Sequence, residues 1–337
     1  MAQPTNTFDT YDAVGIREDL SDVIYNVDPS ETPFYSKSAK TKAKNTLVEW
    51  QTQALRASAV NAHIEGDATT ADAVTPTVRL GARTQIFKNA VVVSDTDEAV
   101  DNAGRAKEMA YQTLLIAKEQ KLDIEKALFA NQGNVVGSNT AARKTGGVPS
   151  WLITNVNFQS GNSGANPTGD GTDARTDDGT PTAFSQAKFD DVMQSIWEEG
   201  GKPDTVYLSA FQMNVALGFT GNNNQRSAVQ AGDETVVKSL AVYVTPWGTV
   251  QFMPSRENRS RDVFVLQDNM WECAVLRGTK NVALAKNGDN TTRQVTTELA
   301  LCSKNEKATA RFTTTPHRNI LQEGAASRPL CLTEGST

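Results

Sequence analysis

Histidine and cysteine are the side chains most able to supply a base or a nucleophile near neutral pH, and this chain has few of either. Its two histidines, His63 and His317, lie in loop-like polar segments, and a Ser or Cys nucleophile would need one of them as its base. The sequence has no G-x-S-x-G motif, no phosphate-binding G-x-x-x-x-G-K-[ST] motif and no zinc-like Cys or His spacing. The sequence therefore predicts a protein that is not an enzyme, with a hydrolase using His63 or His317 as an alternative.

Further candidates for cation binding are four aspartates in a stretch rich in Gly, Ser and Asn: Asp170, Asp173, Asp177 and Asp178. Carboxylates suit Ca²⁺, but these four lack the order of an EF-hand loop. The whole stretch from Asn157 to Pro181 has little to bury, so we expect a solvated surface loop that tolerates an insertion after Gly171. The sequence thus predicts neither a cofactor nor a resident metal.

Charge and cysteine usage restrict the environment of the protein. The 337 residues carry 33 Lys and Arg against 39 Asp and Glu, a net charge of −6, so we expect only weak contact with duplex DNA. The cysteines are odd in number and widely spaced, which favours a reducing compartment over a disulfide framework: Cys273, Cys302 and Cys331. We expect neither a signal peptide nor a membrane span, and therefore a soluble protein made in the cytoplasm.

Two strand-like segments enclose an unusually polar excursion. "NTLVEWQTQAL" (Asn45–Leu55) predicts an outgoing strand, and "TVRLGARTQIFKNAVVVSDT" (Thr77–Thr96) predicts a returning one. The roughly twenty residues between them are polar and rich in Ala and Thr, with too little apolar surface to form a core of their own. We therefore expect the excursion to pack against something outside it.

The strongest periodic segment of the chain follows the second strand. Alanine, leucine and isoleucine recur at three- and four-residue spacing, with N-cap residues from Ser94 and a stop at Gly133. About 34 residues at 1.5 Å each would make a rod of ~50 Å, which we expect to act as a spine.

The remaining segments predict alternating helices and strands. We expect a helix in "FSQAKFDDVMQSIWEEG" that buries Trp197 among other apolar side chains, then a strand and a second helix. Strand pairs are expected with turns at Pro246–Gly248 and Asp268–Asn269, then a meander turning at Asn287–Gly288 and Lys304–Asn305. Residues 1–44 are expected to form an arm with one short helix over 13–27, and the prolines of "VDPSETPF" argue against helix there. The chain as a whole is predicted to be α+β.

This order of segments resembles the major capsid proteins of tailed bacteriophages, which have the HK-97-like fold. The local text is also similar to one capsid subfamily in "TYDAVGIREDLSDVIYNVDPSETPFYS", "NTLVEWQTQAL", "RTQIFKNAVVVSDTDEAVDNAGR" and "TRQVTTELALCSKNEKA". The resemblance runs from about Thr10 to Thr314 and leaves the tail unmatched. It implies an N-terminal arm at 1–44, an extended hairpin called the E-loop at 45–96, a P-domain with the spine helix at 97–145, an α/β A-domain at 146–278, the P-domain β-meander at 279–315 and a C-terminal tail at 316–337.

The resemblance implies a structural protein that self-assembles into an icosahedral head around a double-stranded DNA genome. Its implied partners are copies of itself in hexamers and pentamers, a separate scaffolding protein, a portal protein, a decoration protein and weakly held DNA, with no membrane. Assembly would take place in the bacterial host cytoplasm, and the final location would be the virion capsid. The alternative is an encapsulin-like nanocompartment that shares the fold but encloses protein cargo.

The resemblance also implies where neighbouring subunits touch. The E-loop and the arm are expected to lie on the next subunit, through Trp50, Leu55, Arg56, His63, Glu65, Arg79 and Arg83 of the E-loop and Phe34 and Tyr35 of the arm. Some family members join an E-loop lysine covalently to a neighbour. Here no lysine lies between Lys44 and Lys88, so we expect non-covalent contacts.

Overall fold

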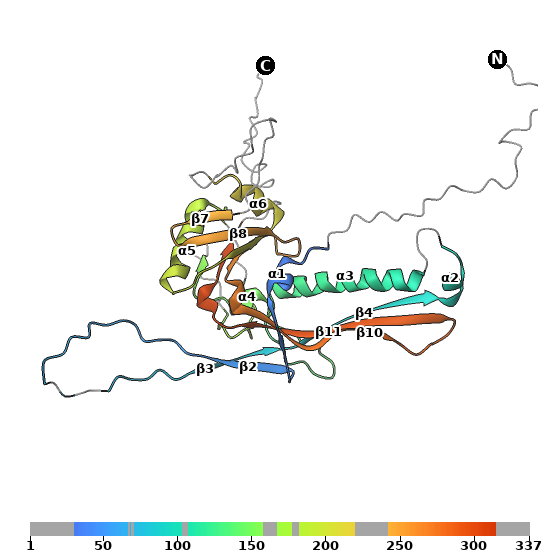
Figure 1. Ribbon diagram of the computed structural model, residues 1–337, viewed down its shortest axis with the longest axis horizontal. Coiled ribbons are helices and arrows are strands. Elements are labelled where there is room, and N and C mark those ends of the chain that lie inside the picture. Colours follow the sequence, from blue (N-terminus) through green and yellow to red (C-terminus); the bar gives the residue numbers. More distant parts are fainter. Residues whose placement is uncertain are drawn as a thin grey trace, which may run out of the picture.

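The computed structural model describes residues 30–66, 68, 71–102, 107–157, 167–176, 182–219 and 242–314. They form a four-stranded sheet, a six-stranded sheet and a two-stranded hairpin that projects from both (Figure 1). None of the described helices is long and apolar enough to cross a membrane. Several expected features lie outside the described residues: the helix over 13–27, Asp177, Asp178, His317, Cys331 and the tail at 316–337.

The four-stranded sheet contains, in spatial order, β1 (Ala39–Lys42), β10 (Trp271–Ala283), β11 (Asn290–Ser303) and β4 (Gln85–Ser94). β1 runs parallel to β10, and the other neighbours are antiparallel. β10 and β11 form a long hairpin whose turn contains Gly288 at φ +119°, a conformation that favours glycine. The expected turn at Asn287–Gly288 is confirmed.

The projecting hairpin pairs β2 (Leu47–Thr52) with β3 (Val78–Arg83) in antiparallel register. The strand expected within Asn45–Leu55 is therefore confirmed. The returning segment is not one strand: Thr84 separates β3 from β4, so that one part pairs with β2 and the other joins the four-stranded sheet.

The spine helix α3 (Glu108–Phe129) lies along one face of the four-stranded sheet (Figure 1). Its 22 residues make it shorter than predicted. Ser94 is indeed a helix cap, but it caps the short α2 (Asp95–Ala99) by accepting a hydrogen bond from the Asp97 N–H at 3.2 Å. The backbone then turns extended at Val100, so α2 and α3 are separate helices. The apolar repeat alone did not reveal this break.

A buried amide attaches α3 to the sheet. Gln120 is 1% exposed, and its Nε2 donates to the carbonyls of Phe87 on β4 and Val295 on β11, at 3.2 and 3.0 Å. Its Oε1 accepts from the Thr297 hydroxyl at 2.9 Å. Because an unmade buried hydrogen bond is costly, these contacts fix the axial position of the helix over the sheet.

The six-stranded sheet contains, in order, β5 (Val156–Asn157), β12 (Ala310–Thr313), β9 (Asp262–Leu266), β6 (Thr205–Leu208), β8 (Gly248–Pro254) and β7 (Val242–Thr245). α5 (Gln186–Glu198) and α6 (Ala210–Ala216) pack with it around an aromatic core that includes Phe189, Phe252 and Phe312. The β7–β8 pair confirms the expected turn at Pro246–Gly248. Trp197 was expected in this core, but its side chain is 57% exposed.

The chain passes between the two sheets at positions where hairpins were expected. The 3-10 turn η1 (Asp268–Met270) connects β9 to β10, and η2 (Glu306–Ala308) lies between β11 and β12. Both pairs are divided between sheets, so the expected hairpin at Asp268–Asn269 and the last turn of the meander are wrong. The expected boundary at 278/279 falls inside β10, and β12 lies in the six-stranded sheet.

A short helix from the arm completes the junction of the two sheets. α1 (Pro33–Lys37) begins with proline at its first turn, where the missing N–H costs no intrahelical bond, so the expectation against helix is wrong here. The Phe34 side chain is 0% exposed and packs 5.1 Å from the Phe129 ring and 5.3 Å from the Tyr207 ring. The buried Glu125 carboxylate accepts hydrogen bonds from the Phe34 and Tyr35 N–H groups, at 3.0 and 2.7 Å.

The aspartate-rich loop is fastened to the body, contrary to expectation. Gly171 is buried against Trp151 of α4 (Val148–Trp151), and its carbonyl accepts a hydrogen bond from the Asn134 N–H at 2.7 Å. Arg175 is 2% exposed and donates to the Leu152 carbonyl. Polar composition did not reveal this packing, because a glycine, backbone groups and a buried arginine side chain make these contacts. An insertion after Gly171 is therefore expected to disrupt the subunit.

The root of the projecting hairpin is held by a buried carboxylate. Glu298 on β11 accepts from the Thr84 hydroxyl at 2.8 Å, from Arg277 Nε at 2.7 Å and from Arg143. Burial opposes the charged form of Glu298, but the hydrogen bonds from Thr84 and Arg277 outweigh it, so its pKa lies below the ordinary value.

Replacing Gly171 with alanine should destabilise the subunit more than replacing Gly200. Both residues have positive φ, +78° and +86°, so each substitution costs about 1–2 kcal/mol of backbone strain. A Cβ at Gly171 would lie 2.5 Å from Trp151 Cζ2, whereas nothing lies within 4 Å at Gly200. The overpacking should add about 1–3 kcal/mol at Gly171 alone, measurable by urea denaturation. Equal losses of unfolding free energy in the two variants would show that the loop around Gly171 shifts to accommodate the added methyl group.

Glu298→Gln should lower stability in a pH-dependent way. Because the pKa of Glu298 is lowered on folding, its contribution is present above the unfolded value near pH 4.5 and is lost as the pH falls through the folded value. We expect a loss of about 1–3 kcal/mol at pH 7 that shrinks toward zero below pH ~4. The control Glu199→Gln, in an exposed pair with Lys307, should cost less than about 1 kcal/mol. A pH-independent difference for Glu298→Gln would contradict this.

Candidate inter-subunit surface

The distal E-loop, residues 53–79, extends away from both sheets (Figure 1). Every described residue in it is exposed. Its internal contacts are sparse and run across the loop: Gln53 Nε2 donates to the Thr75 carbonyl at 2.8 Å, and Arg56 lies 3.6 Å from Asp72. Such exposed contacts contribute little free energy, so the loop gains almost nothing from its own chain.

Four large apolar side chains stand on the part of this exposed loop that lies between β2 and β3, and Val78 at the start of β3 is also exposed. The exposed fractions of the four are 97% for Leu55, 97% for Val60, 83% for Ile64 and 85% for Val74. Burying a side chain of this size is worth about 1.5–3 kcal/mol, and a single subunit provides no place for it. Leu55 was expected here, but the other three were missed because each stands alone in a polar stretch. Their shared exposure indicates a surface made for a partner.

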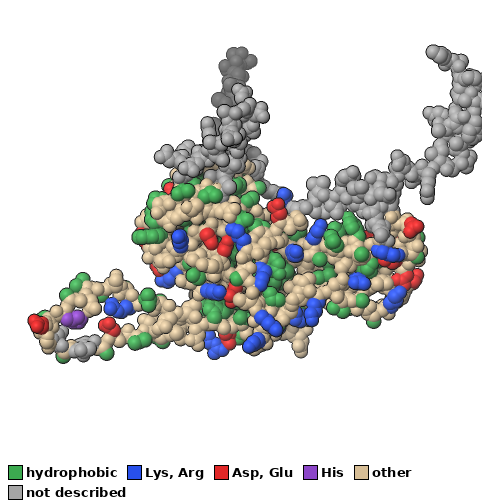
Figure 2. Space-filling model, in the orientation of Figure 1, with side chains coloured by type: hydrophobic (Ala, Val, Ile, Leu, Met, Phe, Trp, Pro, Cys, Tyr) green, Lys and Arg blue, Asp and Glu red, His purple; other side chains and the backbone are tan. Residues whose placement is uncertain are grey.

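Charged residues accompany these apolar side chains. Glu65 lies near the tip and is exposed, and Arg79 forms an ion pair with Glu49 across the hairpin. Figure 2 shows carboxylates and the one described histidine, His63, at the end of the projection. The distal loop therefore presents apolar surface with acidic groups near its tip.

The root of the E-loop is bound to its own chain. Trp50 is half-buried, with its ring 5.5 Å from that of Trp151. Asn134 Oδ1 accepts from the Arg83 N–H at 3.2 Å, and its Nδ2 donates to the Gly81 carbonyl at 3.2 Å. Trp50 and Arg83, both expected at a neighbour, thus help to fix the direction in which the loop leaves the body.

The arm residues also pack within their own chain. Phe34, which was expected at a neighbour, is completely buried and can offer no surface to one. Tyr35 is half-buried, with Lys40 Nζ 4.2 Å from its ring centre, and burial raises the pKa of its hydroxyl. This packing could not be predicted from residue type, because aromatic residues serve cores and interfaces equally well.

Among the residues that the structure describes, the groups best suited to chemistry are not assembled into a site. His63 stands on the exposed loop, with Nε2 2.6 Å from Asn61 Oδ1. Cys273 and Cys302 are buried on β10 and β11, and burial raises the pKa of both thiols, that of Cys273 to about 11. Protonated, buried thiols are poor nucleophiles. Within the described residues no group of three or more His, Cys, Asp or Glu could hold a metal ion.

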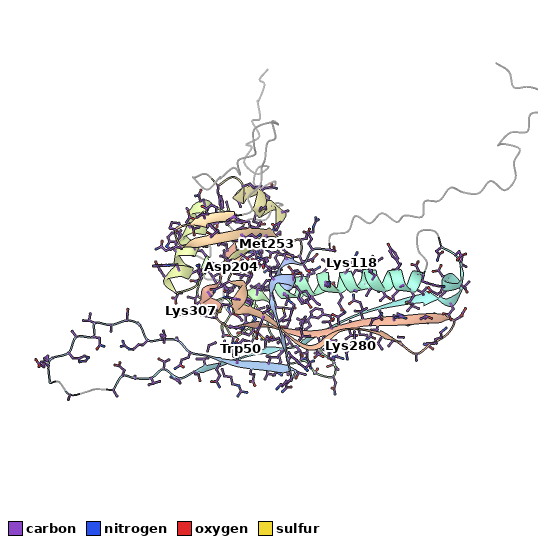
Figure 3. The ribbon with its side chains drawn as sticks, in the orientation of Figure 1. Trp50, Lys118, Asp204, Met253, Lys280 and Lys307 are labelled. Atoms are coloured by element: carbon purple, nitrogen blue, oxygen red, sulfur yellow. The ribbon has the colours of Figure 1, made fainter. Side chains whose placement is uncertain are left out.

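A second surface was not foreseen from the sequence: the face of the four-stranded sheet opposite α3, called here the open sheet face. Alternation along β4 directs Phe87 toward the helix and leaves Ile86 and Val92 on the other side, 48% and 60% exposed. Cross-strand pairing aligns Lys88 with Thr296 and Thr296 with Lys280 on this face. Figure 3 labels Lys280 on the sheet and Lys118 on the helix side.

The open sheet face therefore combines apolar and basic side chains. Val282 adds a 47% exposed side chain beside Lys280, and Arg277 lies near its end. The carboxylate of Glu298, next to Arg277 on this face, already forms ion pairs with Arg143 and Arg277. The chemistry of this face complements that of the distal E-loop.

Comparisons with known proteins agree with this architecture. The sequence model of the SU10 major capsid protein family matches residues 3–316. The chain is 27% identical over 340 residues to the major capsid protein of Escherichia phage Phieco32, covering 91% of this chain and 96% of that protein.

Solved structures show the same fold at low sequence identity. The capsid of cyanophage A-1(L) superposes with a TM-score of 0.65 at 11% identity, covering 88% of this chain and 96% of that one. An encapsulin from Synechococcus elongatus also superposes, with a TM-score of 0.52 at 9% identity and coverage of 87% and 92%. The HK-97-like fold is therefore common to both readings, and the family match decides between them. The chain belongs to the SU10 major capsid protein family and is a structural capsid protein of a phage rather than an enzyme or a cargo compartment.

Proposed function

We propose that the distal E-loop of each subunit lies across the open sheet face of a neighbouring subunit and joins the two without a covalent bond. The observation that carries this proposal is the exposure of every described residue in 53–79, including large apolar side chains such as Leu55 and Val60 that their own chain leaves in water. Burial against a neighbour would remove that cost. Repetition over a closed shell would make a weak contact decisive, because each subunit both gives and receives one.

Charge complementarity supports the choice of receiving surface. Glu65 and Asp72 on the loop would meet Lys88 and Lys280 on the sheet, while Leu55 and its apolar companions would cover the exposed sheet valines. Exposed ion pairs add little affinity, so the apolar contacts supply most of the free energy and the charges favour the correct register.

We further propose the organisation that the family implies around this contact. Subunits would assemble as hexamers and pentamers in the bacterial cytoplasm, with a separate scaffolding protein, a portal protein and a decoration protein. The four-stranded sheet and α3 would form the P-domain, and the six-stranded sheet the A-domain. The net charge of −6 supports weak contact with the packaged double-stranded DNA, which counterions and the closed shell would retain.

Serine at the four apolar positions of the distal E-loop should abolish shells without unfolding the subunit. The changes are Leu55→Ser, Val60→Ser, Ile64→Ser and Val74→Ser. Because all four are exposed, the melting temperature should stay close to that of the wild type, while electron microscopy should show no closed shells. The matched control keeps apolar groups at the same positions, as Leu55→Met, Val60→Ile, Ile64→Val and Val74→Ile, and should assemble. Normal shells from the serine variant would refute the proposed contact between the E-loop and a neighbour. An unfolded subunit would instead show that these side chains pack within their own chain.

Reversing charges on the open sheet face should block assembly in a way that the loop can repair. Lys88→Glu with Lys280→Glu would oppose the loop carboxylates, so shell yield should fall and low salt should deepen the loss. Adding Glu65→Lys with Asp72→Lys should restore part of the yield. Lys118→Glu with Lys121→Glu, on the exposed side of α3, matches the charge change and should not be rescued by the loop changes. Equal rescue of both pairs would mean that net charge alone sets the yield.

A further inference from the structure

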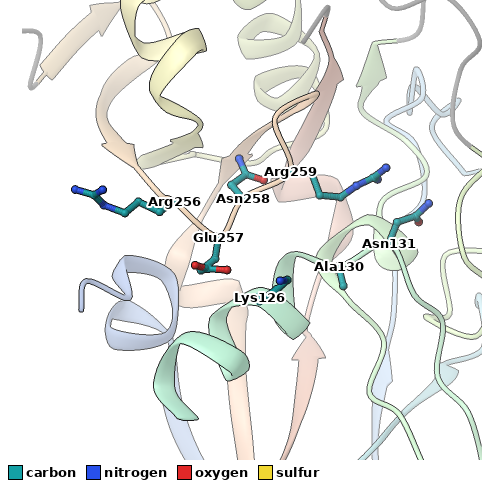
Figure 4. Close-up of a pocket in the computed structure, with 7 residues that line it drawn as sticks. All are labelled: Lys126, Ala130, Asn131, Arg256, Glu257, Asn258 and Arg259. Carbon is teal, nitrogen blue, oxygen red and sulfur yellow. The ribbon is translucent and has the colours of Figure 1, made fainter. Parts of the chain in front are cut away.

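A basic hollow of about 600 Å³ lies where the end of α3 meets the loop between β8 and β9 (Figure 4). Lys126 and Asn131 line it from the helix end and the turn that follows, and residues 256–259 line it from the loop. The lining includes three cations, Lys126, Arg256 and Arg259, against one carboxylate, Glu257. An anionic group is therefore the ligand that the charges favour.

Among the described residues, two cations of the lining have no acidic partner. Lys126 and Arg256 are exposed and form no ion pair within the described part of the chain, whereas Arg259 is bound to Asp262 at 3.0 Å. Asn258 is 6% exposed, and its Nδ2 donates to the Tyr207 and Asp262 carbonyls, so this side chain holds the loop in place. The hollow thus offers two free cations to a ligand.

A peptide segment with acidic side chains is a ligand of the required charge. Its carboxylates can pair with Lys126 and Arg256, and the arginine can hold a carboxylate through two parallel hydrogen bonds. A segment joined to the same chain would also lose less translational freedom on binding than a free anion, so a nearby acidic segment is the favoured occupant.

The start of the described chain lies at the edge of this hollow. Glu125, the residue before Lys126, accepts hydrogen bonds from the Phe34 and Tyr35 N–H groups of α1. Glu257 is close enough to Glu125 to contribute to raising its pKa, although burial is the larger cause. Figure 4 shows the ribbon of α1 beside Glu257. The residues before Ser30 therefore begin next to the basic lining.

Those preceding residues have the required composition. Residues 1–29 contain a single cation, Arg17, and six carboxylates: Asp9, Asp12, Glu18, Asp19, Asp22 and Asp28. From Asp28 to the start of α1 at Pro33 an extended chain can span up to about 17 Å. We propose that the acidic segment from Glu18 to Asp28 binds in this hollow of its own chain, with its carboxylates on Lys126 and Arg256.

Trypsin reports directly on this binding in the full-length, unassembled subunit. Arg17 is the only tryptic site before Lys37, so cleavage there measures how far the segment is held. In low salt the wild type should be cut more slowly than a synthetic peptide of residues 10–29. Lys126→Glu with Arg256→Glu should speed cleavage roughly five- to tenfold, as expected for the loss of a few partly screened ion pairs. Raising the salt should give the wild type the same loss of protection.

Matched variants separate binding from a general charge effect. Lys118→Glu with Lys121→Glu makes the same charge change on exposed positions of α3 and should leave the cleavage rate at the wild-type value. Asp22→Asn with Asp28→Asn should speed cleavage as the hollow variant does, after correction by the matching peptides. Combining these changes with the hollow variant should give no further increase, because both remove the same contact.

Peptide-like cleavage of the wild type, or no effect of the hollow variant, would overturn the proposal. Protection that rises with subunit concentration would overturn binding within one chain and assign the segment to the hollow of a second copy. The proposal would be supported by protection that does not depend on subunit concentration and is lost in the hollow variant. The Asp22 and Asp28 changes should then give no further increase in the cleavage rate of that variant. None of these readings depends on the E-loop contact, because the experiment uses unassembled subunits.

Discussion

The subunit depends on one aromatic contact, in which Phe34 packs against Phe129 and Tyr207 at the junction of the two sheets. Each ring comes from a different part of the fold: the arm, the spine helix and the six-stranded sheet. Trp271 closes the same cluster from the first residue of β10. Because the chain crosses between the sheets beside this cluster, the two layers are held as one body. Because the base of the E-loop is fixed to this body, the direction in which the loop projects is set within the single subunit.

Buried polar groups give this junction its specificity at some energetic cost. The Glu125 carboxylate satisfies two N–H groups of α1, yet burial raises its pKa to about 7 despite those donors. A raised carboxyl pKa means that this group contributes most stability below the unfolded value near 4.5 and progressively less as the pH rises to 7. Apolar packing of Phe34 therefore has to offset part of the cost of docking α1 at neutral pH. The contact fixes the position of α1 more than it adds to net stability.

Local chemistry explains which parts of the fold could be predicted. The turn at Asn287–Gly288 and the E-loop strands follow from residue type and alternation over a few positions. Strand partners could not be predicted, because alternation identifies β10 and β12 as strands but not the sheets they join. The Gly171 loop was misjudged because its packing uses backbone atoms that composition does not reveal. Likewise, the exposure of Val60, Ile64 and Val74 could not be predicted, because it depends on whether another segment of the chain packs on the loop.

The same physical reasoning distinguishes the two kinds of surface on this subunit. In the proposed contact, the exposed apolar side chains of the distal E-loop gain free energy only from a neighbour, so their burial would be linked to assembly. At the basic hollow, the two free cations can be paired by a segment attached a few residues away, which loses little translational freedom on binding. A tethered segment can therefore occupy its site before assembly, when no neighbour is present. The acidic segment is attached to its site and would bind as the subunit folds, whereas the E-loop needs a second subunit and would bind only as the shell forms. This difference in tethering, more than any difference in contact strength, would set the order of the two events.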